Sequence, residues 1–185
     1  MRILHTSDWH LGKMLENRTR YAEQQHFIDE IAEITEKENI DIVILSGDVF
    51  DTSNPPAMAE TMFFDSIVRL AGDKERPVIV SAGNHDSPDR LMAGAGVLRP
   101  YGVFILGRPR DTIPDMDFGG YRIFSDENGA AVVDKNGERA VIAALPYVSD
   151  KRIDEIIGEA GDDRENAASY SQKIETLLDM LSAGF

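Results

Sequence analysis

Polar side chains able to bind a metal ion follow three strand-like stretches of the sequence. The first stretch ends in Asp8-Trp9-His10, the second in Gly47-Asp48-Val49-Phe50-Asp51, and the third in Gly83-Asn84-His85-Asp86. Residues two apart in extended backbone point to the same side, so Asp8 and His10 are expected to reach one common point. Ligand sites of parallel sheets form outside the carboxyl ends of the strands. The three stretches therefore predict one shared polar site.

The donor atoms at this site are carboxylate and carboxamide oxygens and imidazole nitrogens, because the sequence contains no cysteine. This set suits manganese, iron, magnesium or zinc more than copper(I), with Mn²⁺ a natural candidate. Asp48, on the middle stretch, is expected to bridge two ions, and such a pair clamps a phosphoester for attack by water. Taken singly, Asp48 and Asp86 fit caps of the following loops and helices. Three coincident strand ends favour the metal site.

Composition limits the class of protein. A chain of 185 residues with 42% hydrophobic and 28% charged residues fits one globular domain with a sizeable core. It contains no apolar stretch of about 18 residues, so no membrane span is expected. The first residues lack the pattern of a signal peptide. The absence of cysteine is compatible with the cytoplasm, which is the expected location.

The net charge of −14 argues against an autonomous nucleic-acid binder, which normally carries a basic surface. It does not exclude an enzyme that acts on nucleic acid. Acidic clusters recruit divalent cations, and those cations can contact the phosphates instead. Charge alone leaves the partner open.

Strand and helix patterns alternate over the first 106 residues, as in parallel βαβ units. The apolar run at 41–46 is expected to be a central strand covered on both faces. The helix at 19–38 is expected to bury one stripe, formed by Phe27, Ile28, Ile31 and Ile34. The complete set of predicted elements is strands at 2–7, 41–46, 77–81 and 103–106, with helices at 19–38, 57–70 and 88–98.

The pattern changes after residue 108. Alternating segments predict antiparallel strands around 112–118, 121–125, 130–134 and 139–145, and the Asn136-Gly137 pair favours a tight hairpin between the last two. Two helices are expected at 149–159 and 164–182. The sequence thus predicts a single α/β unit of parallel βαβ elements followed by a meander.

The motifs DxH, GDxxD and GNHD, at these intervals, resemble those of the calcineurin-like metallophosphoesterases. The strings HTSDWHLG, GDVFDTSNPP and GNHDSPDR are similar to those of its SbcD-type branch, the bacterial members of the Mre-type double-strand-break nucleases. The resemblance covers most of residues 1–106 and, more loosely, 143–147. It implies an α/β fold in which a β-sandwich is flanked by helices (αββα), with residues 1–185 as its amino-terminal part.

The resemblance also implies an activity and its metal ligands. The activity is that of a metal-dependent DNA exonuclease and endonuclease subunit in DNA repair and recombination, with two divalent ions, of which Mn²⁺ is the expected species. Asp8 and His10 would hold the first metal ion, Asp48 would bridge, and Asn84 would hold the second.

His85 and Asp51 are the catalytic residues that the resemblance implies. His85 would stabilise the transition state or protonate the leaving oxygen. Asp51 occupies the second aspartate of GDxxD, which orients that histidine in related phosphatases. Asp86 is expected to lie behind the ligands or to cap a helix.

The sequence departs from the family pattern in its histidines. The family has three further histidines in its second half, two of them in a GHxH motif, whereas this chain contains only His5, His10, His26 and His85. By strand alternation His5 should face away from Asp8, and both His5 and His26 are interpreted as structural or surface residues. The chain is therefore interpreted as an amino-terminal fragment with an incomplete second metal site and little nuclease activity alone.

Expected partners follow from the resemblance. The helices at 57–70 and 88–98 would form a homodimer interface, DNA would be the substrate, and an SMC-type ATPase of the SbcC kind would be the partner subunit. Lys13, Arg18, Arg20 and Arg90 flank the motifs and are candidates for DNA phosphate contacts. The alternatives are another calcineurin-like phosphodiesterase acting on a small nucleotide ester, and a non-catalytic dimerisation fragment.

Overall fold

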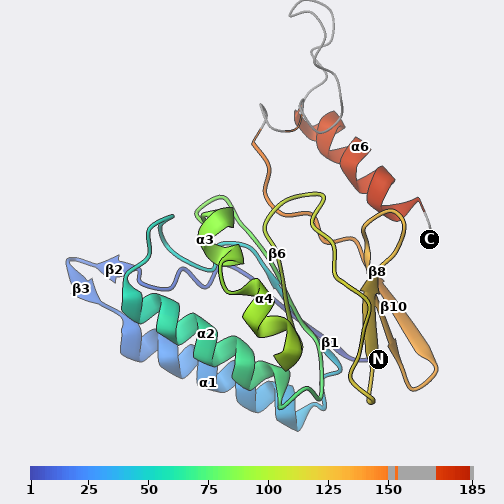
Figure 1. Ribbon diagram of the computed structural model, residues 1–185. Coiled ribbons are helices and arrows are strands. Elements are labelled where there is room, and N and C mark those ends of the chain that lie inside the picture. Colours follow the sequence, from blue (N-terminus) through green and yellow to red (C-terminus); the bar gives the residue numbers. More distant parts are fainter. Residues whose placement is uncertain (150–152, 154–169, 184–185) are drawn as a thin grey trace, which may run out of the picture.

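A four-stranded parallel sheet forms the first half of the chain in the computed structural model, which describes residues 1–149, 153 and 170–183 (Figure 1). Its strands lie in the order β1-β4-β5-β6, so β4 and β5 are interior. Because β4 is apolar and interior, it is covered on both faces as the sequence predicts. The strands are β1 (Ile3–Thr6), β4 (Ile42–Ser46), β5 (Val78–Ser81) and β6 (Val103–Leu106).

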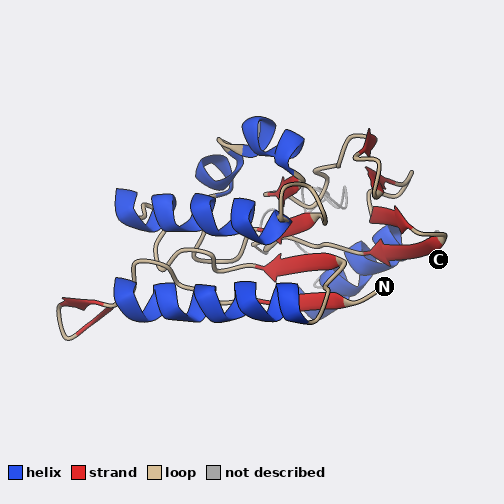
Figure 2. Ribbon diagram, turned by 90° about the horizontal axis from the view of Figure 1, so that it is seen from below, coloured by secondary structure: helices blue, strands red, loops and turns tan. Residues whose placement is uncertain are grey.

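Helices connect these parallel strands and cover one face of the sheet. The two long helices, α1 (Tyr21–Lys37) and α2 (Ala57–Ala71), lie side by side (Figure 2). The last crossover contains α3 (Pro88–Met92), α4 (Ala95–Leu98) and the 3₁₀ turn η1 (Arg99–Tyr101). Phe63 and Ile67 of α2 are fully buried in the core that these helices share with the sheet.

A second, antiparallel sheet covers the other face. Its order is β10-β9-β8-β7, formed by β7 (Met116–Asp117), β8 (Arg122–Ser125), β9 (Ala131–Lys135) and β10 (Glu138–Ile142). Ile42, Ile79 and Phe104 of the parallel sheet share a core with Ile123 and Val133 of this sheet. The molecule is therefore a β-sandwich with helices on the outer face of the parallel sheet, consistent with the predicted fold.

The predicted Asn-Gly hairpin is confirmed. Lys135 pairs with Glu138, which leaves Asn136 and Gly137 as a two-residue turn with φ values of 53° and 80°. Positive φ at both positions defines the turn type that matches the twist of antiparallel strands, and asparagine and glycine adopt it at least cost.

Several predicted details differ from the structure. The buried face of α1 consists of Ile28, Ile31, Ala32 and Thr35, whereas Phe27 and Ile34 are 41% and 42% exposed. The buried positions follow the i, i+3, i+4, i+7 spacing of a helix face, which Phe27 and Ile34 do not share. The predicted helix at 88–98 is interrupted at Gly94, where a Cβ would lie 3.1 Å from the Phe64 ring.

The remaining differences concern short or partly described segments. Only β7 forms within the predicted strand 112–118. A short hairpin of β2 (Met14–Leu15) and β3 (Arg18–Thr19), which the sequence pattern did not indicate, projects beside α1. The expected helix at 149–159 lies almost entirely outside the described residues, and α6 (Tyr170–Ser182) forms within the expected 164–182. In the described part of the chain, no helix has the length and apolarity needed to span a membrane.

Candidate metal centre

The loops that follow β1, β4 and β5 lie against one another and form the predicted site. The amides of Asp8, His10 and Leu11 donate to the carbonyls of Gly47, Asp48 and Val49 at 3.2, 3.0 and 2.9 Å, so parallel pairing continues beyond the strands. Gly47 contacts the third loop so closely that a Cβ on it would lie 2.9 Å from the Gly83 Cα. A Cβ on Gly83 would overlap the amide nitrogen and carboxylate of Asp48. Glycine at these positions lets the loops meet.

Asp86 joins the same loops from within. Its side chain is buried, and it accepts hydrogen bonds from the amides of Gly83 at 2.8 Å, Phe50 at 3.0 Å and Val49 at 3.2 Å. The N-cap of α3 is Ser87. Asp86 therefore lies behind the candidate ligands, as the first of its two expected roles requires, and does not cap the following helix.

Three of the predicted metal ligands converge. His10 Nε2 lies 3.8 Å from Asp8 Oδ1 and 3.8 Å from Asp48 Oδ2. The ligand atoms of Asp8, His10 and Asp48 all lie within 4.8 Å of one another. Asn84 lines the same cavity of about 490 Å³ as Asp8 and Asp48. The structure thus brings together the four residues expected to bind metal.

The backbone at these ligands is not extended. Asp8, His10 and Asp48 have φ values of 57°, 44° and 49°, in the left-handed region that non-glycine residues rarely adopt. Asp8 and His10 therefore converge for a reason other than strand alternation, and that part of the prediction is wrong. Strained backbone of this kind clusters at functional sites, where the surrounding contacts hold it in place.

The surroundings of the pair agree in part with the sequence. Trp9 is buried as expected, with its indole N–H donating to Thr6 Oγ1 at 3.0 Å. The expectation that His5 faces away from Asp8 is wrong, because both line the same cavity. His5 Nε2 lies 2.7 Å from Ser46 Oγ. Strand alternation failed here because the chain leaves the extended conformation between His5 and Asp8.

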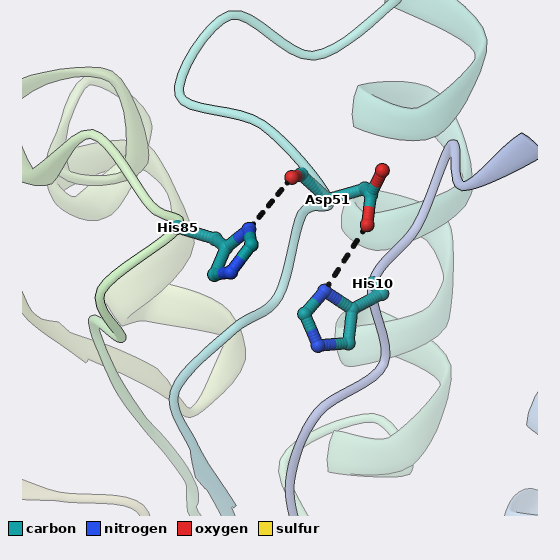
Figure 3. Close-up of side chains that lie close together, drawn as sticks. All are labelled: His10, Asp51 and His85. Carbon is teal, nitrogen blue, oxygen red and sulfur yellow. Dashed lines mark hydrogen bonds and ion pairs between the residues drawn. The ribbon is translucent and has the colours of Figure 1, made fainter.

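Asp51 lies between His10 and His85 (Figure 3). Its backbone carbonyl accepts a hydrogen bond from His85 Nδ1 at 2.8 Å, whereas its carboxylate Oδ1 lies 3.3 Å from His10 Nδ1 and 3.5 Å from Lys13 Nζ. The rings of His10 and His85 meet edge to face, with their centroids 5.0 Å apart. The hydrogen bond to Asp51 raises the pKa of His85, and the charges of Asp48 and Asp51 act in the same direction.

These residues fit a divalent metal ion. Asp8 and Asp48 supply carboxylate oxygens and His10 an imidazole nitrogen, which are donors that Mn²⁺, Fe²⁺ and Zn²⁺ accept. His10, Asp51 and His85 form a second group of donor atoms within 4.8 Å, with His10 common to both groups. The site lies at the carboxyl ends of the parallel strands, where the fold places ligands.

Comparison with known proteins identifies the family. The model of the calcineurin-like phosphoesterase family matches residues 1–177, and the chain belongs to this family of metal-dependent phosphoesterases. Among curated proteins, the chain is similar to the SbcD subunit of nuclease SbcCD from Bacillus subtilis, with 37% identity over 185 residues, which is all of this chain and 44% of that protein.

Two further relatives carry the same name. The SbcD subunit from Rhodobacter capsulatus is 35% identical over 150 residues, covering 80% of this chain and 35% of that protein. The Escherichia coli K12 protein is 46% identical over 98 residues, covering 53% of this chain and 24% of that protein. The chain thus spans less than half the length of these relatives.

Among solved structures, the crystal structure of Pseudomonas putida nuclease MPE aligns with 91% of this chain and 82% of its own, at 14% identity and a TM-score of 0.38. A TM-score of this size does not establish a shared fold.

Proposed function

We propose that this chain is the amino-terminal part of an SbcD-like DNA nuclease, a metal-dependent exonuclease and endonuclease subunit acting in DNA repair and recombination in the cytoplasm. The observation that carries the proposal is the convergence of Asp8, His10 and Asp48, from two strand-end loops, in a chain of the calcineurin-like phosphoesterase family. The names of the relatives and the share of their length that the chain covers support the choice of substrate and the partial domain.

Each site residue has a proposed role. Asp8 and His10 hold a first metal ion, Asp48 bridges, and Asn84 holds a second ion, with Mn²⁺ as the metal. When bound, the ions supply electrostatic stabilisation of the phosphoryl oxygens. His85 stabilises the developing charge or gives a proton to the leaving oxygen. The Asp51 carbonyl accepts from its Nδ1 and so leaves Nε2 as the nitrogen that exchanges a proton.

Replacing Asp48 by asparagine is expected to weaken Mn²⁺ binding by at least about 100-fold, more than is typical for residues behind the ligands. The change removes the charge of the residue that both ions share while preserving its size. Calorimetric titration of the chain with Mn²⁺ measures the effect, and Asp179→Asn, on exposed α6, is the control for loss of one charge. Equal Mn²⁺ affinity of Asp48→Asn and the original chain would contradict the proposed ligand set.

The substrate is tested on the full-length protein, by comparing Mn²⁺-dependent hydrolysis of duplex DNA and of a small nucleotide phosphodiester. Preference for DNA is expected, and preference for the small ester would favour a different phosphodiesterase. For the 185-residue chain alone we expect weak or absent binding at the second metal position and little turnover. Two ions per chain with robust turnover would contradict the partial-site proposal.

The proposed partners are DNA and an SbcC-type SMC ATPase, as the name of the relatives suggests. Arg18, on the projecting β2–β3 hairpin, and Lys13, beside Asp51, are the basic side chains we propose to lie nearest bound DNA. Arg20 and Arg90 form surface ion pairs with Glu23 and Glu60, so we assign them smaller contributions.

We also propose a homodimer through helices 57–70 and 88–98, which correspond to α2, α3 and α4. Met58 and Val97 on these helices are 59% and 73% exposed, an unusual exposure for large apolar side chains that association would remove. Val97→Glu is expected to convert the dimer to a monomer, measured as mass by light scattering. Val141→Glu, on β10, is the matched control. A monomeric original chain, or a Val97→Glu variant of unchanged mass, would reject this surface.

A further inference from the structure

Asp51 contacts the two site histidines through two different groups. Its carbonyl oxygen can only accept, so the 2.8 Å bond places a hydrogen on Nδ1 of His85. Its carboxylate does not make that bond and instead lies 3.3 Å from Nδ1 of His10 (Figure 3). The side chain of Asp51 and its backbone therefore act on different rings, whereas the sequence pattern assigned the side chain to His85.

The environment of His10 gives this contact its importance. His10 Nδ1 is buried and has no hydrogen bond of regular geometry among the described residues, and the Asp51 carboxylate is the acceptor beside it. The opposite ring nitrogen, Nε2, faces the carboxylates of Asp8 and Asp48. A buried N–H needs an acceptor, so a hydrogen on Nδ1 facing Asp51 leaves Nε2 with its lone pair toward the other two carboxylates.

We propose that Asp51 is a positioning residue for His10, whose carboxylate fixes the tautomer and ring orientation that present Nε2 to the metal ion. This inference rests on the proposed metal function of Asp8, His10 and Asp48. Acceptors behind a ligating histidine raise its basicity and commonly contribute roughly 10- to 100-fold to metal affinity. Lys13, 3.5 Å from the same carboxylate oxygen, balances its charge and keeps it an acceptor at neutral pH.

The test compares Asp51→Ala and Asp51→Asn with the original chain, and uses Asp179→Asn as the control for charge. Long-range ¹H–¹⁵N NMR spectra report the tautomer of each histidine without added metal, and calorimetry reports the affinity for Mn²⁺ alone. In Asp51→Ala we expect His10 to lose its preference for Nδ1–H, His85 to retain it, and Mn²⁺ to bind about 10- to 100-fold more weakly. Asp51→Asn retains an acceptor oxygen and should recover part of both.

The two readouts separate this inference from the function on which it rests. An original chain that binds no Mn²⁺ would overturn the metal function, while the His10 tautomer would still decide the role of Asp51. An unchanged His10 tautomer in Asp51→Ala would overturn the positioning role. Simultaneous changes in His10 and His85 would also overturn it, because they would show that the substitution disturbs the whole loop.

Discussion

The Gly83→Ala variant is expected to unfold about 3 kcal/mol more easily than the original chain, at the upper end of the cost of overpacking. The added methyl group would overlap the backbone nitrogen and carboxylate of Asp48, which cannot turn away as the end of a flexible side chain would. The loops after β4 and β5 must therefore separate. For a chain of this size the loss corresponds to a midpoint of thermal unfolding lower by roughly 6–12 °C.

Gly83→Ala should also weaken Mn²⁺ binding by about 10-fold or more, because Asp48 moves away from His10 and Asp8. Urea denaturation and calorimetric titration measure the two effects. Gly96→Ala is the matched control: Gly96 lies in α4, a Cβ there meets nothing within 4 Å, and alanine should stabilise the helix by about 0.5–1 kcal/mol. A Gly83→Ala variant as stable as the original chain would show that these two loops do not meet as described.

The fold was largely predictable because its signals are local. The run at 41–46 is apolar throughout and strand-length, so it could only be an interior strand, and β4 is one. The Asn136-Gly137 turn was predictable because few residues tolerate its backbone. The buried stripe of α1 was misplaced because Phe27 and Ile34 are apolar, and apolarity alone does not identify which face meets the sheet.

The members of the site were predictable, but their geometry was not. Strand ends place Asp8, His10 and Asp48 together in any parallel sheet of this order, so residue type and position sufficed. The left-handed backbone at all three depends on contacts with neighbouring loops that the local sequence does not specify. The division of Asp51 between His10 and His85 likewise depends on the relative placement of three loops, which only the structure provides.

Asp86 is the residue whose importance was most underestimated, and its replacement by alanine is expected to lower the free energy of unfolding by about 3 kcal/mol or more. The carboxylate accepts from the amides of Val49, Phe50 and Gly83, and each buried donor left without a partner costs about 1–3 kcal/mol. Water reaching the emptied position would recover part of this. Because Val49 directly follows Asp48, Mn²⁺ affinity should fall together with stability.

Urea denaturation of Asp86→Ala and Asp89→Ala tests this prediction on two aspartates three positions apart. The Asp89 side chain is 85% exposed and pairs with Arg108 at the surface, so its removal should cost less than about 1 kcal/mol. Asp86→Asn should fall between the two, because it retains one acceptor oxygen but turns an amide NH₂ toward backbone donors. Equal stability of Asp86→Ala and Asp89→Ala would mean that the loops are held by the Gly47–Gly83 contact and the backbone pairing of Asp8 and His10, and that the buried carboxylate contributes only marginally.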